Sequence, residues 1–508
     1  MSTGSESAPV FLIVGLTTLY NVGIGISHSF TIELVQTLAC AEYYYSPSSD
    51  GTTFPTLPTT DDPFLWCSVA PVDKRTSQVE TSIDTFSSLT ACVASLVLAK
   101  YVFPRAGRRT IGIALPLLGI ISAMLVALIP THYSFDAAIP STSTVHPTTC
   151  LNLLALYVVA GLLGVPQTAS LLLSQVMVLD VCREDEKTSA FAQVYATMTL
   201  GMACSSIILR LVLPFFGLDF SVLRHSVPPP ATRICWWMGR SSTANPRSST
   251  AAIFESIKET LALFGYLLPY QPSPDAKRDF KLPLILCAVV TTDTISLIWG
   301  NLIIFCSTHL RFGPMEVATL LGIIGAGRGL FSILALPLIV KAVRRVVASR
   351  MRQELRETFV EEASTETRVV KREESVIRTD RLVASASLLC DCFGFIAMGI
   401  AASHLCANGI YDSVTFLLVA SGALPAIQAL CVDFFLAQNR QTDDPLIARD
   451  VFVGFISLLM SIMQTVGPLI NNAIYQWSID HSVPYLVFLW TATVSFTTLS
   501  FVTLADFF

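Results

Sequence analysis

Charged residues are scarce in this chain. Asp, Glu, Lys and Arg make up 14% of its 508 residues, whereas hydrophobic residues make up 52%. A soluble globular protein carries roughly 25% charged residues. The net charge of −5 is small, and no basic patch is interleaved with aromatic residues, so we expect no nucleic-acid partner. The composition predicts a protein whose surface faces mainly lipid.

Motifs of enzyme chemistry are missing as well. The 13 Cys show neither paired CxxC motifs nor the Cys/His spacing of a metal site. No HExxH, nucleotide-binding loop or nucleophile elbow occurs. The stretch GAGRG at 325–329 lies inside an apolar run, where small residues permit close packing of helices. We therefore expect no enzyme activity, no cofactor and no metal ion.

The hydrophobic residues gather in blocks of about 20, the length that crosses a bilayer core of about 30 Å. Because backbone polar groups must be paired internally in lipid, such blocks are predicted to be helices. The first block is too long for a cleavable signal peptide and no Lys or Arg precedes it, so it is expected to be retained. Eleven blocks are clear: 9–35, 82–103, 110–130, 150–178, 189–214, 281–306, 315–340, 381–404, 412–437, 450–475 and 484–505.

Lys and Arg in the loops predict the orientation of the chain. The polar stretch 341–380 holds ten of them, and the short loop 104–109 holds three. Such loops stay on the cytoplasmic side of a membrane. The loops 41–80 and 131–149 carry few or none and are expected to face outward, which places the N-terminus in the cytoplasm. We expect 341–380 to be a solvated linker, with some helix in it.

This orientation requires a sixth span between the fifth and the next clear block. It can only lie within 215–250, which contains Arg224, Arg233 and the prolines Pro228 to Pro230. Each central charge costs about 2.5–3.5 kcal/mol on insertion scales, and consecutive prolines break a helix. Two interpretations stay open: a broken span shielded by protein, or a damaged stretch such as a retained intron or a frameshift.

The predicted fold is therefore an all-α integral membrane protein with two six-helix bundles and 11–12 transmembrane helices, of which helix six is degenerate. Residues 1–221 form the N-terminal bundle. Residues 222–280 hold the degenerate span and a cytoplasmic linker, with an amphipathic helix near 253–268. Residues 281–508 form the C-terminal bundle. Two such halves around a central path are an architecture of secondary carriers.

Several segments, taken in order, resemble one transporter family. They are IELVQTLACAEYYY at 32–45, FPRAGRRTIG at 103–112, DVCREDEKTSAFAQ at 180–193, FCSTHLRFGPMEVATLLGIIGAGRGL at 305–330, SGALPAIQALC at 421–431 and TVGPLINNAIYQ at 465–476. The chain resembles a fungal member of the major facilitator superfamily, in the branch similar to tetracycline-efflux and proton-coupled folate carriers. The resemblance implies a secondary active transporter that works by alternating access.

The resemblance also implies a cytoplasmic gate in the loop between spans two and three. Arg105, Gly107, Arg108 and Arg109 match the family signature, but Pro104 replaces its Asp. The Gly-Pro signature of drug/proton antiporters in span five is absent too. These departures weaken the prediction of normal gating and of efflux.

Ionisable residues inside a span are functional candidates because their burial in lipid is costly. Asp293 could bind a proton or a cationic substrate, or be a structural acid bonded to a neighbouring Thr. Arg328 could hold an anionic group or pair with Asp293. Glu33 and His28 lie near the outer end of span one, and either could be an interface or packing residue. Asp391 lies about halfway along span nine, a helix that is usually peripheral in this architecture, so we expect no substrate role for it.

Neutral and loop residues complete the candidates. Asn301, Gln167 and Gln428 could line the cavity or bond neighbouring helices. Asp180 with Lys187 could form a cytoplasmic latch between spans four and five, or be a solvated loop pair. Cys40 and Cys67 could form a disulfide if their loop is not cytoplasmic.

The sequence thus predicts a carrier of an unidentified small solute, with or without proton coupling. The alternative is a transport-inactive carrier-like protein, either a sensor or a damaged gene product, which Pro104 and the degenerate sixth span support. We expect a monomer in the bilayer of either the plasma membrane or the vacuole.

Overall fold

The computed structural model describes residues 13–15, 17–22, 70–97, 169–182, 186–215, 263–271, 278–312, 314–357, 365–438 and 445–507, with five single residues in between. In this part of the chain the structure is helical, apart from one isolated antiparallel bridge between Tyr270 and Asp279. The degenerate stretch 215–250 lies outside the described residues except for Phe215, so the prediction of a broken sixth span stays open.

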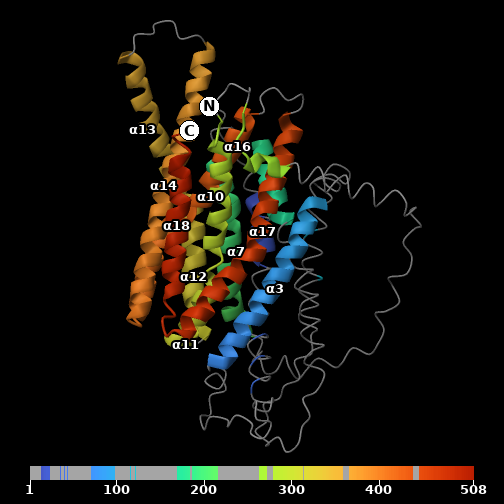
Figure 1. The fold of residues 1–508 in the computed structure, drawn as a ribbon, viewed down its shortest axis with the longest axis vertical. Helices are drawn as coiled ribbons and strands as arrows, with labels where there is room; N and C mark the ends of the chain where they lie inside the picture. The colour runs from blue at the N-terminus through green and yellow to red at the C-terminus, as the bar shows by residue number, and fades with distance from the viewer. Residues whose placement is uncertain are drawn as a thin grey trace, which may run out of the picture.

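The described residues include six helical stretches long and apolar enough to cross a membrane. They are Lys281–His309, Thr319–Met351, Glu374–Ser403, Ala407–Gln438, Val451–Asp480 and Leu486–Leu504. All six match the spans predicted for the C-terminal half. Figure 1 shows them standing side by side along the long axis of the molecule. We call the helices between residues 281 and 507 the C-terminal helix group.

Four described helices belong to the predicted N-terminal half, and we call them the N-terminal helix group. They are Ile13–Val22, Ala169–Val181, α3 (Ala70–Val97) and α7 (Lys187–Phe215). α3 begins twelve residues before its predicted start at 82. Its first three turns are polar, but Val72 and Val79 are buried. A helix that buries one face inside protein does not need a continuous apolar sequence.

Two of the spans are interrupted. The first C-terminal span consists of α10 (Lys281–Ser296) and α11 (Trp299–His309). Before the break, the hydroxyls of Thr291, Thr292 and Thr294 bond backbone carbonyls of the preceding turn, a pattern that loosens and bends helices. The span Ala407–Gln438 consists of α15 (Ala407–Val419) and α16 (Ala423–Gln438), joined by a single 3-10 turn, η5.

Two helices extend beyond the rest of the bundle. α12 (Pro314–Leu330) continues through the π turn η4 (Phe331–Ala335) into α13 (Leu336–Glu357), and α14 runs from Thr365 to Ser403. The stretch 341–380 is therefore helical on both sides of residues 358–364 rather than a plain solvated linker. Figure 1 shows the two extensions, and we call this end of the molecule the α13–α14 end.

The last helices complete the C-terminal group. α17 spans Pro445–Asp480 with Pro468 inside it, and α18 spans Leu486–Leu504. α14 packs against α18, and Arg381 of α14 forms an ion pair with Asp506 just after α18. This pair holds the end of the described chain at the α13–α14 end, where Figure 1 shows the C-terminus.

The short turn η3 (Phe264–Leu267) lies at the end of the predicted amphipathic helix 253–268. Residues 253–262 of that predicted helix lie outside the described residues, and the aromatic side chains of η3 are half-buried. The ring of Tyr266 lies edge-on to Phe435 of α16 at 5.3 Å between centroids, and Phe264 meets Phe455 of α17 at 5.4 Å. These aromatic contacts attach the segment before α10 to the C-terminal group.

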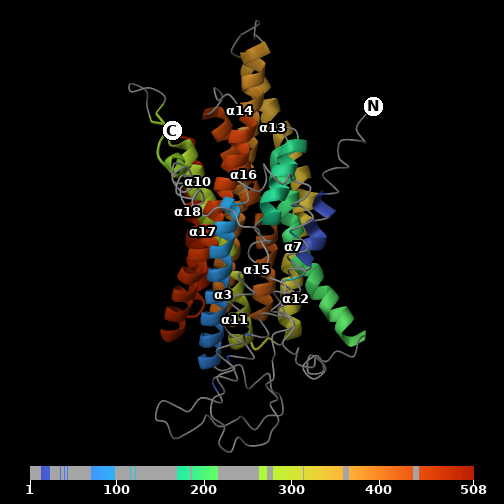
Figure 2. The ribbon, with the colours of Figure 1, turned by 90° about the vertical axis from the view of Figure 1, so that its right-hand side faces the viewer.

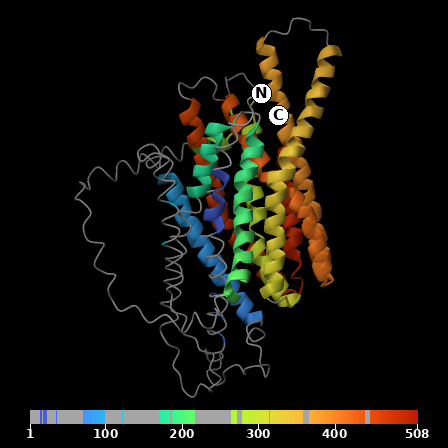
Figure 3. The same cartoon turned by 180° about the vertical axis from the view of Figure 1, so that it is seen from behind.

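Helices of the two groups pack directly on each other. α3 packs against α17, and α7 packs against α12 and α16. Figure 2 shows α3 in front of α17, and Figure 3 shows α7 beside α12. A Cβ added at Gly325 of α12 would lie 2.7 Å from the carbonyl oxygen of Thr199 in α7. The prediction that the GAGRG stretch permits close packing is confirmed.

Gly325→Ala is expected to destabilise the protein because the new methyl group meets backbone, which cannot move aside. Overpacking of this kind costs about 1–3 kcal/mol. Gly322→Ala, one turn earlier in α12, is the matched control, since a Cβ there meets nothing within 4 Å. Thermal unfolding in detergent should show a lower midpoint for Gly325→Ala alone. Equal midpoints for the two variants would contradict the close approach of α7 and α12.

Candidate functional site

A cavity of about 300 Å³ lies between the two helix groups. On α3 it is lined by Ser77, Glu80, Thr81 and Asp84. These positions are three or four residues apart, so they share one face of the helix. The remaining lining comes from α7, from the break between α10 and α11, from α12 and from α17. The cavity is therefore built by helices of both groups, as a carrier requires.

Arg328 lies on the α12 side of this cavity. Its guanidinium carbon is 5.4 Å from the ring centre of Trp299, the first residue of α11, in a cation–π arrangement. Behind it, the charge of Arg328 interacts with Asp391 of α14. Among the described residues, Arg328 thus faces Asp391 rather than Asp293, so the alternative in which Arg328 pairs with Asp293 is not the one found. The Asp391 side chain is buried, at 4% exposed.

Asp293 lies in α10, one turn before the cavity residue Ser296. It is 2% exposed, and Gln464 of α17 donates a hydrogen bond to its carboxylate. The hydroxyls of Thr291 and Thr294 instead bond backbone carbonyls, so neither neighbouring Thr bonds the acid. The second carboxylate oxygen has no hydrogen-bond partner among the described residues.

The predicted amide residues separate in the structure. Asn301 lines the cavity. Gln428 of α16 lies elsewhere: its side-chain nitrogen donates to the hydroxyl of Tyr195 in α7 at 2.6 Å. Gln175 also donates to that hydroxyl, at 3.0 Å, and to the Gln428 side-chain oxygen, at 3.3 Å. This amide–tyrosine network bonds the two helix groups to each other.

Two ion pairs connect the groups nearer the α13–α14 end. Lys187 at the start of α7 pairs with Asp433 of α16 at 2.7 Å, and Arg449 of α17 pairs with Asp180 at 2.7 Å. Asp380 of α14 is 1% exposed, and its charge interacts with Lys187. The prediction that Asp180 and Lys187 pair with each other is wrong. α7 packs against α16, which brings Lys187 to Asp433, while Arg449 of α17 contacts the end of the helix Ala169–Val181 at Leu179 and Asp180.

The other predicted site residues lie outside the described part of the chain: Glu33, His28, Gln167, Arg105, Gly107, Arg108, Arg109, Cys40 and Cys67. The gate signature, the outer acid and the disulfide therefore stay predictions.

Sequence reasoning missed Glu80 and Asp84. Both lie where the predicted outer loop meets span two. A charged residue at the end of a span has a low free-energy cost, so it is usually interpreted as a boundary residue. The signal that could have found them is the helical spacing of Ser77, Glu80, Thr81 and Asp84, which continues the face of a helix into the supposed loop.

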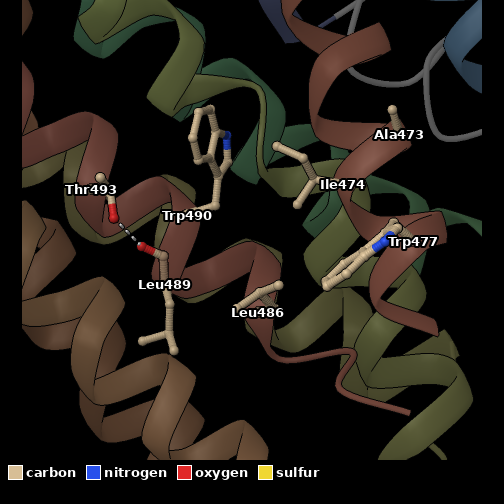
Figure 4. A pocket seen from close by; sticks show the side chains of 7 residues that line it. All are labelled: Ala473, Ile474, Trp477, Leu486, Leu489, Trp490 and Thr493. Atoms are coloured by element: carbon tan, nitrogen blue, oxygen red, sulfur yellow. Dashed lines mark hydrogen bonds between the residues drawn. The ribbon is translucent and has the colours of Figure 1, made fainter. Parts of the chain in front are cut away.

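A second cavity of about 530 Å³ lies between α17 and α18 (Figure 4). Its lining includes Ile474, Leu486 and the rings of Trp477 and Trp490. The hydroxyl of Thr493 is already bonded to the Leu489 carbonyl, as the figure shows. This cavity offers no charged group and suits an apolar occupant, unlike the cavity between the helix groups.

No protein-family model matches the sequence, and no curated protein sequence matches it either. Among solved structures, the chain is similar to the human organic anion transporter MFSD10, with a TM-score of 0.58 and 12% identity over 98% of this chain and 100% of that one. It is also similar to a bacterial homologue of the iron transporter ferroportin in an outward-facing state, with a TM-score of 0.50 and 9% identity over 98% and 97% of the two chains.

At these identities the likeness shows the fold alone. The chain is an integral membrane protein with an all-α fold of the major-facilitator type. Both structural neighbours are transporters, and the polar cavity lies between helices of both groups.

Lys187→Met is expected to destabilise the protein strongly, because Asp433 loses this partner in a site where both side chains are at most 14% exposed. Removing one member of a buried pair costs about 3–5 kcal/mol. The double variant Lys187→Met/Asp433→Leu should recover most of the lost stability. Lys74→Met is the control, since its pair with Asp480 is exposed and worth about 0–1 kcal/mol. Equal loss for the two single variants in thermal unfolding would refute this reading of the pair.

Proposed function

We propose that the protein is a secondary active transporter that moves a small solute across a membrane by alternating access. The observation that carries this proposal is the cavity between the two helix groups, because helices of both groups supply its polar lining. Secondary carriers hold their substrate between two bundles that rock against each other. The likeness to transporters of known structure supports the proposal.

The ion pairs between the groups provide the gate in this proposal. The Lys and Arg residues of 341–380 favour a cytoplasmic location for the α13–α14 end. Lys187–Asp433 and Asp180–Arg449 then hold the cytoplasmic ends of the two groups together. Separation of these pairs exposes the cavity to the cytoplasm, and the amide–tyrosine network around Tyr195 must also part.

Asp293 is the proposed site of proton coupling. Its carboxylate lies in a span next to the break between α10 and α11, and it contacts α17 through Gln464. α17 also packs on α3 of the other group. Protonation of Asp293 removes a buried charge and changes the hydrogen bond to α17, which biases one arrangement of the groups over the other.

The finer assignments remain part of the proposal. The segments that resemble tetracycline-efflux and proton-coupled folate carriers favour that branch, and a monomer in a plasma or vacuolar membrane is the simplest state. The transport-inactive alternative rests on Pro104 and on 215–250, which lie outside the described residues apart from Phe215. The next experiment separates it from a carrier.

Labelling of an Asn301→Cys variant in sealed vesicles tests alternating access without a known substrate. A membrane-impermeant thiol reagent should reach position 301, which lines the cavity, from either side of the membrane, with the product read by peptide mass. Adding Lys187→Met and Arg449→Met should increase cytoplasmic labelling several-fold because the gate is weakened. Gly322→Ala is the added control. Labelling from one side only, in every variant, would identify a transport-inactive protein.

The same labelling assay tests the role of Asp293. In the Asn301→Cys variant with Asp293 intact, the ratio of inside to outside labelling should change with pH, because the charge of the proposed coupling residue biases the two arrangements. Asp293→Asn should make the ratio independent of pH. Glu374→Gln, an exposed carboxylate on the α14 extension, should leave the pH dependence unchanged. A pH dependence that survives Asp293→Asn would assign coupling to another group.

A further inference from the structure

The cavity between the helix groups has an acidic and a basic side chain beside one short segment, Trp299 and Gly300. A Cβ at Gly300 would lie 3.6 Å from a carboxylate oxygen of Glu80, so this acid lies against Gly300. Arg328 lies over the ring of Trp299, the preceding residue. Neighbouring Cα atoms are about 3.8 Å apart. The carboxylate and the guanidinium therefore lie beside the same two residues, where α10 ends and α11 begins.

The break in this span makes the arrangement possible. α10 ends at Ser296 and α11 starts at Trp299, and the Glu80 carboxylate lies beside Gly300, at ordinary van der Waals distance from where a Cβ of that residue would be. The beginning of a helix also carries partial positive charge, which favours an acid beside it. The start of α11 thus offsets the charge of Glu80 in the cavity wall, so Glu80 does not require an ion pair with a Lys or Arg of the protein.

Two buried nitrogen atoms of cavity-lining side chains lack a hydrogen bond to any described residue. The side-chain nitrogen of Asn471 has no hydrogen-bond partner among the described residues, although Asn471 is 2% exposed and lines the cavity. The same holds for Nε of Arg328. Within the described part of the chain no ion pair involves Glu80. An unpartnered buried polar group is costly, so these groups point to a ligand that accepts at one end and donates at the other.

The balance of charge limits what that ligand can be. An anion alone would meet Glu80 and Asp84, which share one face of α3 and repel it. A cation alone would be repelled by Arg328. It would also leave Nε of Arg328 and the side-chain nitrogen of Asn471 without a hydrogen-bond acceptor. Asp391 lies behind Arg328 and balances its charge when the cavity is empty, while a guanidinium retains donors for a second acceptor.

We propose that the cavity binds a small zwitterionic solute, with its anionic group at Arg328 and Asn471 and its ammonium group at Glu80 and Asp84. This inference rests on the proposed transport function and names its substrate class. The volume of about 300 Å³ is at the lower limit of ligand pockets, which favours a short, unbranched molecule.

A matched set of probes tests the class: ω-amino acids of about three to six carbons, each with the carboxylic acid and the amine of the same length. The purified full-length protein is titrated with each, and the thermal midpoint reports binding, since a ligand of the folded state stabilises it. We expect at least one ω-amino acid to bind tenfold or more tightly than its matched acid and amine. Equal binding of acid or amine, or no shift with any ω-amino acid at millimolar concentration, would overturn the proposal.

Two variants assign the two ends of the ligand. Glu80→Gln should remove the advantage of the ω-amino acid over the matched acid, and Asn471→Ala should weaken both carboxylate-bearing probes while leaving the amine unchanged. Glu374→Gln is the control for the loss of an exposed carboxylate. Midpoints without ligand verify that each variant folds. An unchanged probe ranking in Glu80→Gln would overturn the assignment.

The outcomes separate the substrate class from the transport function. Labelling of position 301 from both sides without any response to ω-amino acids would retain a carrier and reject the class. Stabilisation by an ω-amino acid with labelling from one side only would retain the binding site and reject transport.

Discussion

A charged side chain inside a bilayer-spanning bundle must find its compensation on another helix, and the packing of helices within the C-terminal group and between the two groups depends on this constraint. Lys187 meets Asp433, Arg328 is balanced by Asp391, and Asp293 accepts a hydrogen bond from Gln464. Each contact joins two different helices. Because an uncompensated charge in lipid costs several kcal/mol, each contact also excludes packings in which those helices separate without water entering between them.

Small residues determine where this compensation can occur. Gly325 brings the backbone of α12 against Thr199 of α7, and Arg328 follows less than one turn later. The close contact directs one side of α12 toward the N-terminal group and leaves Arg328 between the cavity and Asp391 of α14. On the N-terminal group, the Glu80 carboxylate lies beside Gly300 at the break between α10 and α11, in ordinary van der Waals contact. The close approach of the α12 and α7 backbones therefore determines the position of the charged side chain on α12.

The sequence predicted those features that depend on composition along the chain. Six apolar blocks after residue 281 correspond to six spans, because the thickness of a bilayer sets the length of a crossing helix. Features that depend on which side chains of different helices contact each other were not predictable. Asp180 and Lys187 are close in sequence, yet each pairs with a residue more than 240 positions away. The start of α3 was not predicted because its polar first turns bury only one face against protein. An average of hydropathy over a window does not distinguish the buried face of a helix from the exposed one. The contact of Arg328 with Asp391 was not predicted because the sequence does not show which face of α14 meets Arg328.

The two ends of the interface differ in how strongly they hold the groups together. At the α13–α14 end, Lys187–Asp433 is mostly buried and is joined by Asp180–Arg449. Toward the opposite end, α3 and α17 meet through the hydrogen bond from Ser77 to Asn472 at 2.5 Å and through the exposed pair Lys74–Asp480. An exposed pair contributes about 0–1 kcal/mol, whereas buried partners are costly to separate one at a time. If both members of a buried pair enter water together, however, hydration replaces much of the lost attraction. The buried pair Lys187–Asp433 therefore resists partial opening more than complete opening, which favours two discrete arrangements of the helix groups over a continuous range. The proposed alternating access needs this property, because an arrangement open at both ends would leak the solute.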